Sequence, residues 1–218
     1  YSMVNAYAQM STANDNFLLE VFPYSHSLVV NFSDYDNDKD GLVDGLMLLY
    51  SGRAYQETLK ETDPLRAVTV FPQALEPVTG SFIQRAIRLL ETEGGNILLP
   101  GGIAHELSHT LGAPDLYDRN AGELGLDGGI GSWDMMCNGS RGKWWGTTTL
   151  DPRKPIGYSA FSRMSMGWVQ PREIESNQEV RLKPGETARL WTDSLRSTEY
   201  LLLENRDRSG VDSVLPGP

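Results

Sequence analysis

The stretch PGGIAHELSHTLGAPD (residues 100–115) decides how the rest of the sequence is interpreted. It predicts a helix that opens at Pro100 and runs to about Leu111. Gly112 and Pro114 end this helix, because glycine accepts the left-handed conformation of a helix cap and proline cannot continue the hydrogen-bond ladder. Apolar side chains are expected on the buried side of the helix: Ile103, Ala104, Leu107 and Leu111.

Within this predicted helix, His105-Glu106-x-x-His109 forms a metal-binding pattern. Residues four apart share one face of a helix and are separated by about 6 Å along its axis, so both imidazoles can reach one ion. Zinc lowers the pKa of a bound water from about 15.7 towards 7 and polarises a carbonyl group. Glu106, beside the first histidine, can take the proton of that water and pass it to a leaving amine. The pattern therefore predicts zinc-dependent peptide hydrolysis with Glu106 as the general base.

The third protein ligand of the metal is less directly indicated. The chain has three histidines, and the one outside the motif, His26, lies far upstream in a turn-like segment, where we interpret it as an ordinary residue. The ligand is then a carboxylate or Cys137, the single cysteine. Asp115 is the best candidate, because the exit of the chain at Gly112 allows it to swing back towards the metal. Glu123 is a possible substitute, and Cys137 is disfavoured because a lone buried cysteine usually acts as an apolar filler.

An acidic loop precedes the most apolar segment of the first half of the chain. Along it, carboxylates occupy every second position, at Asp36, Asp38 and Asp40, and Gly41 follows, as at the start of an EF-hand loop. Asp44 lies near a later ligand position of such a loop. The twelfth position is Met47 instead of a bidentate glutamate, and a strand is expected next, so the loop is not an EF-hand. We predict a structural calcium site, against the alternative of a hydrophilic Asp/Asn-rich turn.

Composition narrows the class of protein. The 218 residues carry a net charge of −10, which argues against binding to nucleic acid or to an anionic membrane. No apolar run approaches the roughly 18 residues that span a bilayer. A single cysteine excludes a disulfide within the chain. The start at Tyr1 and the loop-like ending at Pro218 suggest a segment of a longer precursor.

Hydrophobic periodicity gives a coarse map of the remaining elements. Helical patterns are expected at residues 2–10 and at 156–166, after Pro155. Strands are expected at residues 17–22, 27–32, 46–50 (buried), 67–71, 179–182, 188–191 and 200–204, whereas residues 83–90 fit either a strand or a helix. Residues 119–147 are rich in Gly, Asp, Trp and Thr and are expected to form irregular loops.

Several segments together resemble the immune inhibitor A-like metalloproteases, the M6 peptidases. The specific matches are HELSHTLGAPDLYD (residues 105–118) and GSWDMM (residues 131–136), which is similar to the Met-turn of that family. Further similarity covers DYDNDKDGLVD (residues 34–44), SMGWV (residues 165–169) and YLLLENR (residues 200–206). Family members usually continue past the Pro-Gly at residues 216–217, where this chain stops.

The resemblance implies an α+β, zincin or metzincin-like fold with a twisted, mostly parallel sheet and an active-site helix. The catalytic domain would cover residues 1–170, followed by a partial β-rich region at residues 171–218. Met136 would form an apolar floor under the metal ligands. The resemblance also implies a secreted or cell-surface bacterial endopeptidase with protein or peptide substrates, joined to other domains of its precursor.

Other functions remain open at this stage. A catalytically inactive binding or adhesion module can share the fold, although such a module need not keep Glu106. A different zinc amidohydrolase could use the same activated water. Tyr117 and Tyr158 are weak candidates for stabilising an oxyanion, because tyrosines more often serve packing.

Overall fold

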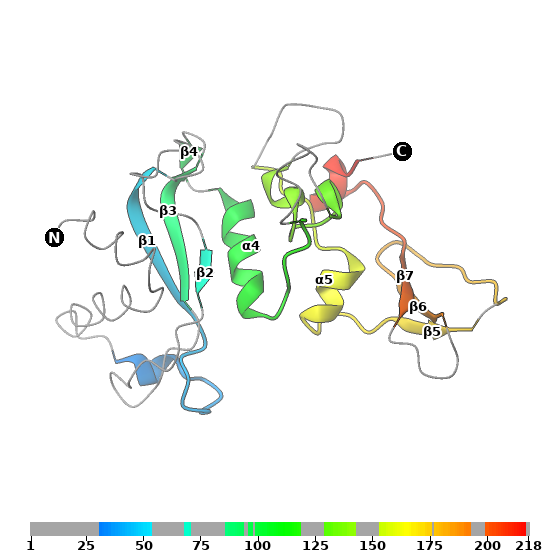
Figure 1. Cartoon of the computed structure of the whole chain (residues 1–218), viewed down its shortest axis with the longest axis horizontal. Coiled ribbons are helices and arrows are strands. Elements are labelled where there is room, and N and C mark those ends of the chain that lie inside the picture. Colours follow the sequence, from blue (N-terminus) through cyan, green and yellow to red (C-terminus); the bar gives the residue numbers. More distant parts are fainter. Residues whose placement is uncertain are drawn as a thin grey trace. The chain divides into compact units, whose positions relative to one another are not determined.

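The computed structural model describes residues 31–53, 68–70, 86–93, 96–97, 99–118, 129–142, 153–175, 177–192 and 199–216. The chain forms two compact units, residues 1–99 and residues 100–218, which are considered separately below (Figure 1). The helix expected at residues 2–10, the strand at 17–22, His26 and Glu123 lie outside the described residues.

The first unit contains a small four-stranded sheet. Its strands are β1 (Leu46–Arg53), β2 (Val68–Val70), β3 (Ala86–Glu93) and β4 (Asn96–Ile97). β3 lies between β1 and β2 and also pairs with β4; its pairing with β1 is parallel, and its pairings with β2 and β4 are antiparallel (Figure 1). The ambiguous segment 83–90 thus supplies the start of a strand. Within this sheet, the expected parallel character is confirmed for the β1–β3 pair, whereas the other two described pairings are antiparallel.

Burial in this sheet is concentrated in β3, where Ala86, Ile87 and Leu89 are almost completely buried. The strand expected at residues 46–50 is confirmed as part of β1, but the expectation that it is buried is wrong. Met47 is 44% exposed and Leu49 is 63% exposed. Alternate side chains of a strand share one face, so Met47 and Leu49 lie on the same face of β1, and that face is exposed.

The segment before β1 also differs from expectation. Residues Phe32–Tyr35 form a short 3-10 helix, η1, so Phe32 is not the end of a strand. Phe32 and Val43 are buried at the two ends of the acidic loop, and the amide of Asp44 donates to the carbonyl of Tyr35 over 3.0 Å. This arrangement closes the loop on itself.

The second unit begins with α4 (Pro100–Thr110), which confirms the helix predicted at its start. Gly112, with φ at +97°, ends it as expected. Gly101 is needed where the helix packs on the 3-10 helix η4 (Asn138–Arg141), because a Cβ there would lie 1.8 Å from the carbonyl oxygen of Ser140.

The expected buried side of α4 is wrong in part. Leu107 is 43% exposed and Leu111 is 46% exposed, whereas the buried residues are Gly101, Glu106 and Ser108. The Ser108 side lies against Tyr158, whose hydroxyl is 2.7 Å from the Ser108 hydroxyl. Close packing against small and polar residues, instead of a leucine stripe, therefore fixes this helix within its unit.

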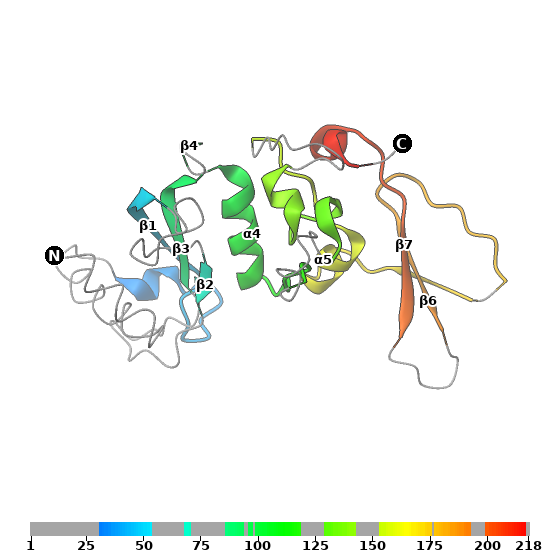
Figure 2. The ribbon, with the colours of Figure 1, turned by 45° about the horizontal axis from the view of Figure 1, so that its top comes forward.

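The remaining elements of the second unit are short. They are the 3-10 helix η3 (Gly131–Trp133), α5 (Ala160–Ser165), the strands β5 (Arg172–Ile174), β6 (Thr187–Trp191) and β7 (Tyr200–Glu204), and the 3-10 helix η5 (Gly210–Val214). β6 pairs with β5 in parallel. It pairs with β7 in antiparallel orientation, and these two strands lie side by side in Figure 2. The mixture of helices and strands confirms the α+β class.

Three features of this unit differ from the expected elements: the start of one helix, one absent strand and one additional strand. The helix expected at residues 156–166 begins only at Ala160, because the amides of Gly157 and Ser159 donate to side-chain carboxylates instead of opening a helix. Residues 179–182 are not a strand. The neighbour of β6 is instead β5, which was not anticipated.

Polar side chains of the C-terminal part, residues 199–216, connect this part to α5 and to the residues just before it. The Oε2 atom of Glu204 accepts hydrogen bonds from the amide of Ala160 (2.8 Å) and from Arg163 (3.1 Å). Arg206 pairs with Asp212 and donates to the carbonyl of Gly157 over 3.1 Å. The boundary expected at residue 170 lies inside the second unit, and the division into residues 1–170 and 171–218 stays a prediction.

Within the described residues, no helix has the length and apolarity that crossing a bilayer requires.

Candidate metal centre

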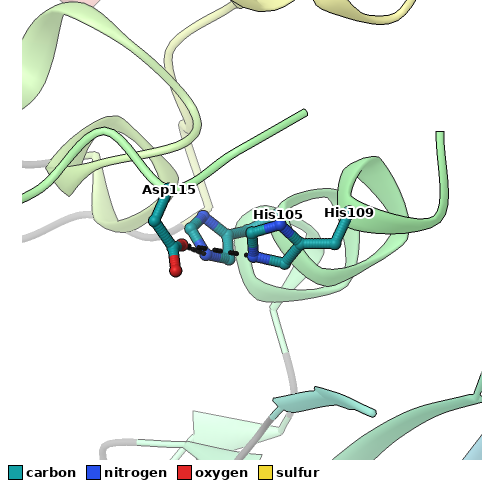
Figure 3. Close-up of side chains that lie close together, drawn as sticks. All are labelled: His105, His109 and Asp115. Atoms are coloured by element: carbon teal, nitrogen blue, oxygen red, sulfur yellow. Dashed lines mark ion pairs between the residues drawn. The ribbon is translucent and has the colours of Figure 1, made fainter. Parts of the chain in front are cut away.

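Helix α4 places the two motif histidines on one side, one turn apart. Their ring centroids are 5.0 Å apart and the rings meet edge to face, so the Nε2 atoms of His105 and His109 approach the same point (Figure 3). The chain leaves the helix through Gly112, and the amide of Ala113 donates back to the carbonyl of Ser108. This sharp exit turns Asp115 towards the two rings, as the sequence predicts (Figure 3).

One carboxylate oxygen of Asp115 lies between the two imidazoles. Its Oδ1 atom is 3.3 Å from Nε2 of His105 and 3.2 Å from Nε2 of His109. The three side chains are largely buried, and their ligand atoms all lie within 4.8 Å of one another. A tetrahedral zinc ion with ligands about 2.0–2.2 Å away holds neighbouring ligand atoms about 3.3 Å apart. The donor set and its spacing therefore fit zinc.

The other nitrogen of each ring is held by a backbone carbonyl. Nδ1 of His105 is 3.0 Å from the carbonyl oxygen of Met135, and Nδ1 of His109 is 2.8 Å from that of Ala113. A carbonyl oxygen can only accept, so each Nδ1 carries the hydrogen and each neutral ring keeps the Nε2 lone pair for a metal. Sequence reasoning missed these partners, because a backbone carbonyl leaves no signature in the sequence.

The electrostatic surroundings of His109 favour its protonated form when no metal is bound. Burial lowers the pKa of His109, but hydrogen bonds to Asp115 and to the Ala113 carbonyl, together with the charges of Asp115 and Glu106, outweigh it and raise the pKa above the ordinary 6.5. A proton and a metal ion would compete for this nitrogen.

Glu106 lies next to the histidine pair and is itself buried, with 8% of its surface exposed. Its negative charge is one of the causes that raise the pKa of His109. A carboxylate in this position can accept a proton from a water molecule held by the ligand set.

The two tyrosine candidates have different surroundings. The ring of Tyr117 stacks on His105 with centroids 6.5 Å apart, and its hydroxyl donates to Oδ2 of Asp115 over 2.9 Å. The hydroxyl of Tyr158 instead lies 2.7 Å from the Ser108 hydroxyl and 3.2 Å from the Ala104 carbonyl oxygen. Burial raises the pKa of Tyr158, partly offset by the hydrogen bond to Ser108. Tyr117 is thus the tyrosine that touches the ligand set.

The predicted Met-turn is a buried segment with backbone contacts to the residues of this region. Met136 is fully buried, and its carbonyl accepts a hydrogen bond of 2.9 Å from the amide of Leu116, next to Asp115. Cys137 is also buried, but it does not belong to the group of possible metal ligands. The apolar floor predicted for Met136 is consistent with this burial.

The acidic loop brings three of its four predicted ligands together. Oxygen atoms of Asp36, Asp38 and Asp40 lie within 4.8 Å of one another. Asp44 is outside this group, and its Oδ2 atom accepts hydrogen bonds from the backbone and side-chain amides of Asn37. Carboxylates gathered in this way suit a hard cation.

The same carboxylates also organise the turn. Oδ1 and Oδ2 of Asp36 accept from the amides of Asp40 (3.1 Å) and Gly41 (3.0 Å), and Oδ1 of Asp40 accepts from the amide of Leu42 (2.8 Å). The bond from the Leu42 amide to Asp40, two residues earlier, is typical of an Asx turn. The alternative of a hydrophilic turn therefore also has structural support.

The chain matches no known family model and no curated protein. The motif residues and the geometry of the three ligands consequently carry the functional argument. Fold alone would not supply it, since one fold hosts many activities.

Proposed function

We propose that the chain is a zinc-dependent endopeptidase whose ion is held by His105, His109 and Asp115. The observation that carries this proposal is the position of Asp115 Oδ1, almost equidistant from two Nε2 atoms at separations that fit a tetrahedral ion. Three protein ligands leave a fourth position for water, as catalytic zinc sites require. Backbone carbonyls on both Nδ1 atoms add support, because they hold the rings in the ligating tautomer.

A zinc ion at this site would supply a Lewis acid for the scissile carbonyl and an acidified water. The carboxylate of Glu106 would accept one proton from that water as its oxygen bonds to the carbonyl carbon. The same carboxylate would then donate the proton to the amide nitrogen as the C–N bond breaks, so that a free amine and a carboxyl group result.

The competing functions make different use of Glu106. An inactive binding module on the same scaffold would have no need of a buried carboxylate beside the ligands, which favours an enzyme. Another zinc amidohydrolase would use the same residues on smaller amides. On the resemblance of residues 105–118 and 131–136 alone, we also propose that the chain belongs to the immune inhibitor A-like peptidases, with a zincin fold, secretion from the cell and further domains in the precursor.

The decisive experiment combines metal analysis with proteolysis. The wild-type chain should contain about one zinc per molecule and cleave unlabelled casein, whereas Glu106→Gln should retain the zinc and lose at least about 10³-fold in kcat. Asp115→Ala should lose both zinc and activity, because two ligands remain. Cleavage of small amides without cleavage of casein would favour the amidohydrolase. A wild-type chain that binds no zinc would refute the proposal.

We further propose that calcium occupies the acidic loop through Asp36, Asp38 and Asp40. Three carboxylates held this closely repel one another unless a cation or hydrogen bonds compensate. The cation would stabilise the turn before β1 and would take no part in hydrolysis.

A further inference from the structure

Asp134 is a buried carboxylate to which sequence reasoning assigns no role. It has no exposed surface, and its two oxygens accept three hydrogen bonds. Oδ1 accepts from the amide of Met136 over 2.5 Å, while Oδ2 accepts from the amide of Ser159 (2.7 Å) and from the hydroxyl of Ser162 (2.8 Å). Burying a carboxylate is costly unless it is hydrogen-bonded, so the position of Asp134 is strongly determined.

The amide that Oδ1 holds belongs to a peptide group with a second partner. The nitrogen of that group is in Met136 and its carbonyl is in Met135, and the carbonyl oxygen lies 3.0 Å from Nδ1 of His105. A peptide group is planar, so fixing its N–H also fixes the direction of its C=O. The carboxylate and the imidazole thus hold the two ends of one rigid dipole.

We propose that Asp134 is a positioning residue for the metal ligand His105, acting through the Met135–Met136 peptide group. The inference rests on the proposed zinc site and adds to it a carboxylate–peptide–histidine chain of hydrogen bonds. A metal-bound histidine commonly donates its other N–H to a carboxylate or carbonyl, which fixes the ring and raises its basicity. Here the carboxylate polarises the carbonyl from the far side of the peptide group, since hydrogen bonds in a chain strengthen one another.

The second histidine supplies an internal control. Nδ1 of His109 also contacts a carbonyl, that of Ala113, but the next residue is Pro114, which has no N–H. No carboxylate can act on His109 through this peptide group. Loss of the Asp134 charge should therefore affect His105 and spare His109.

Two variants separate positioning from general stability. Asp134→Asn removes the charge and one acceptor. Ser162→Ala removes one of the two donors to Oδ2 of Asp134 and leaves the hydrogen bond that the Met136 amide donates to Oδ1. Zinc affinity of the full chain, measured by competition with a chromophoric chelator, should fall about tenfold or more in Asp134→Asn. Ser162→Ala should stay within about twofold of the wild type, even though its unfolding midpoint falls.

Nuclear magnetic resonance of the zinc-loaded protein identifies which ring is affected. The Nδ1–H resonance of His105 should move in Asp134→Asn while that of His109 keeps its position. If Asp134→Asn does not fold, the wild type provides the test: zinc binding to His105 should move the Met136 amide proton downfield more than that of Cys137, which donates to the backbone carbonyl of Asp134.

The outcomes distinguish this inference from the proposed function. A wild type that binds zinc and cleaves casein, with an Asp134→Asn variant of equal zinc affinity, would overturn the inference alone. Equal losses of affinity in Asp134→Asn and Ser162→Ala, or equal movement of the two histidine resonances, would reduce Asp134 to a structural residue. In the wild type, equal movement of the Met136 and Cys137 amides would do the same. A wild type without zinc would refute the proposed function, and the inference with it.

Discussion

The hydroxyl of Tyr117 donates a hydrogen bond of 2.9 Å to Oδ2 of Asp115, while Oδ1 of the same carboxylate lies between the two histidines. The two oxygens of Asp115 therefore have separate tasks. A donor on Oδ2 would disfavour bidentate coordination and would direct Oδ1 at the proposed metal. We therefore propose that Tyr117 orients the proposed ligand Asp115, which is a different role from the oxyanion donor that the sequence suggests.

Tyr117→Phe tests this distinction. We expect about a tenfold loss of zinc affinity, because the phenylalanine ring can still stack on His105 but can no longer hold Asp115. Chelator competition measures the loss. Tyr158→Phe is the matched control, since its hydroxyl contacts α4 instead of the ligands. A fall in kcat of about 10²-fold at unchanged zinc affinity would instead favour the oxyanion role.

The raised pKa of His109 predicts a pH dependence of metal binding. Zinc must displace the proton from this ring, so zinc affinity should rise with pH until the pH exceeds the raised pKa. The rise should continue above pH 6.5, the ordinary value for histidine. Calorimetric titrations in buffers of different ionisation enthalpy measure the protons released. If release is already absent at pH 6.5, the pKa of His109 is not raised.

The raised pKa of His109 also makes the stability of the metal-free protein depend on pH, but this stability should fall as the pH rises, whereas zinc affinity should increase. A folded-state pKa above the unfolded value adds stability that is fully present below the unfolded pKa and is lost as the pH rises through the folded pKa. Denaturation in the presence of chelator should therefore show this contribution below pH 6.5 and its loss at higher pH. Addition of zinc should reverse the trend, since the metal replaces the proton.

The sequence predicts those parts of this site whose residues lie close together along the chain. His105, Glu106, His109 and Asp115 lie within one helix and its exit, where helical spacing and glycine rules apply, and the structure brings the three proposed ligands together. Asp134 acts on residues 25 and 28 positions further along the chain. No local pattern encodes these two contacts, so Asp134 could not be selected from the sequence.

Element boundaries show the same limit. The helical periodicity of residues 156–166 is real only from Ala160 onwards, because the amides before it bind Asp134 and Asp212. Burial also depends on neighbours that periodicity does not identify, which explains why Leu107 is exposed and Ser108 is buried.

Calcium at the acidic loop predicts a gain in stability that depends on calcium alone. At about 100 times its dissociation constant, a ligand stabilises the folded state by about 2.7 kcal/mol. Calcium added at constant zinc should therefore raise the melting temperature, and Asp38→Ala should abolish that rise. Glu91→Gln, at an exposed carboxylate outside the loop, is the control and should keep the rise. No rise in the wild type would leave the hydrophilic turn as the explanation.

From the partly buried ion pair between Arg206 and Asp212, we predict that the C-terminal residues 199–216 stabilise the second unit. The Arg206 side chain is only 8% exposed and donates to both oxygens of Asp212, at 2.9 Å and 2.6 Å, and to the carbonyls of Trp133 and Gly157.

Arg206→Ala would leave a partly buried carboxylate and two carbonyls without this donor, and we expect a loss of about 3 kcal/mol in the free energy of unfolding. Chemical denaturation of the zinc-free chain measures this loss without interference from metal binding. Arg181→Ala is the matched control, because Arg181 is 92% exposed in its ion pair with Glu179 and such pairs contribute little. Equal denaturation midpoints for the two variants would mean that Arg206 does not anchor the C-terminal part.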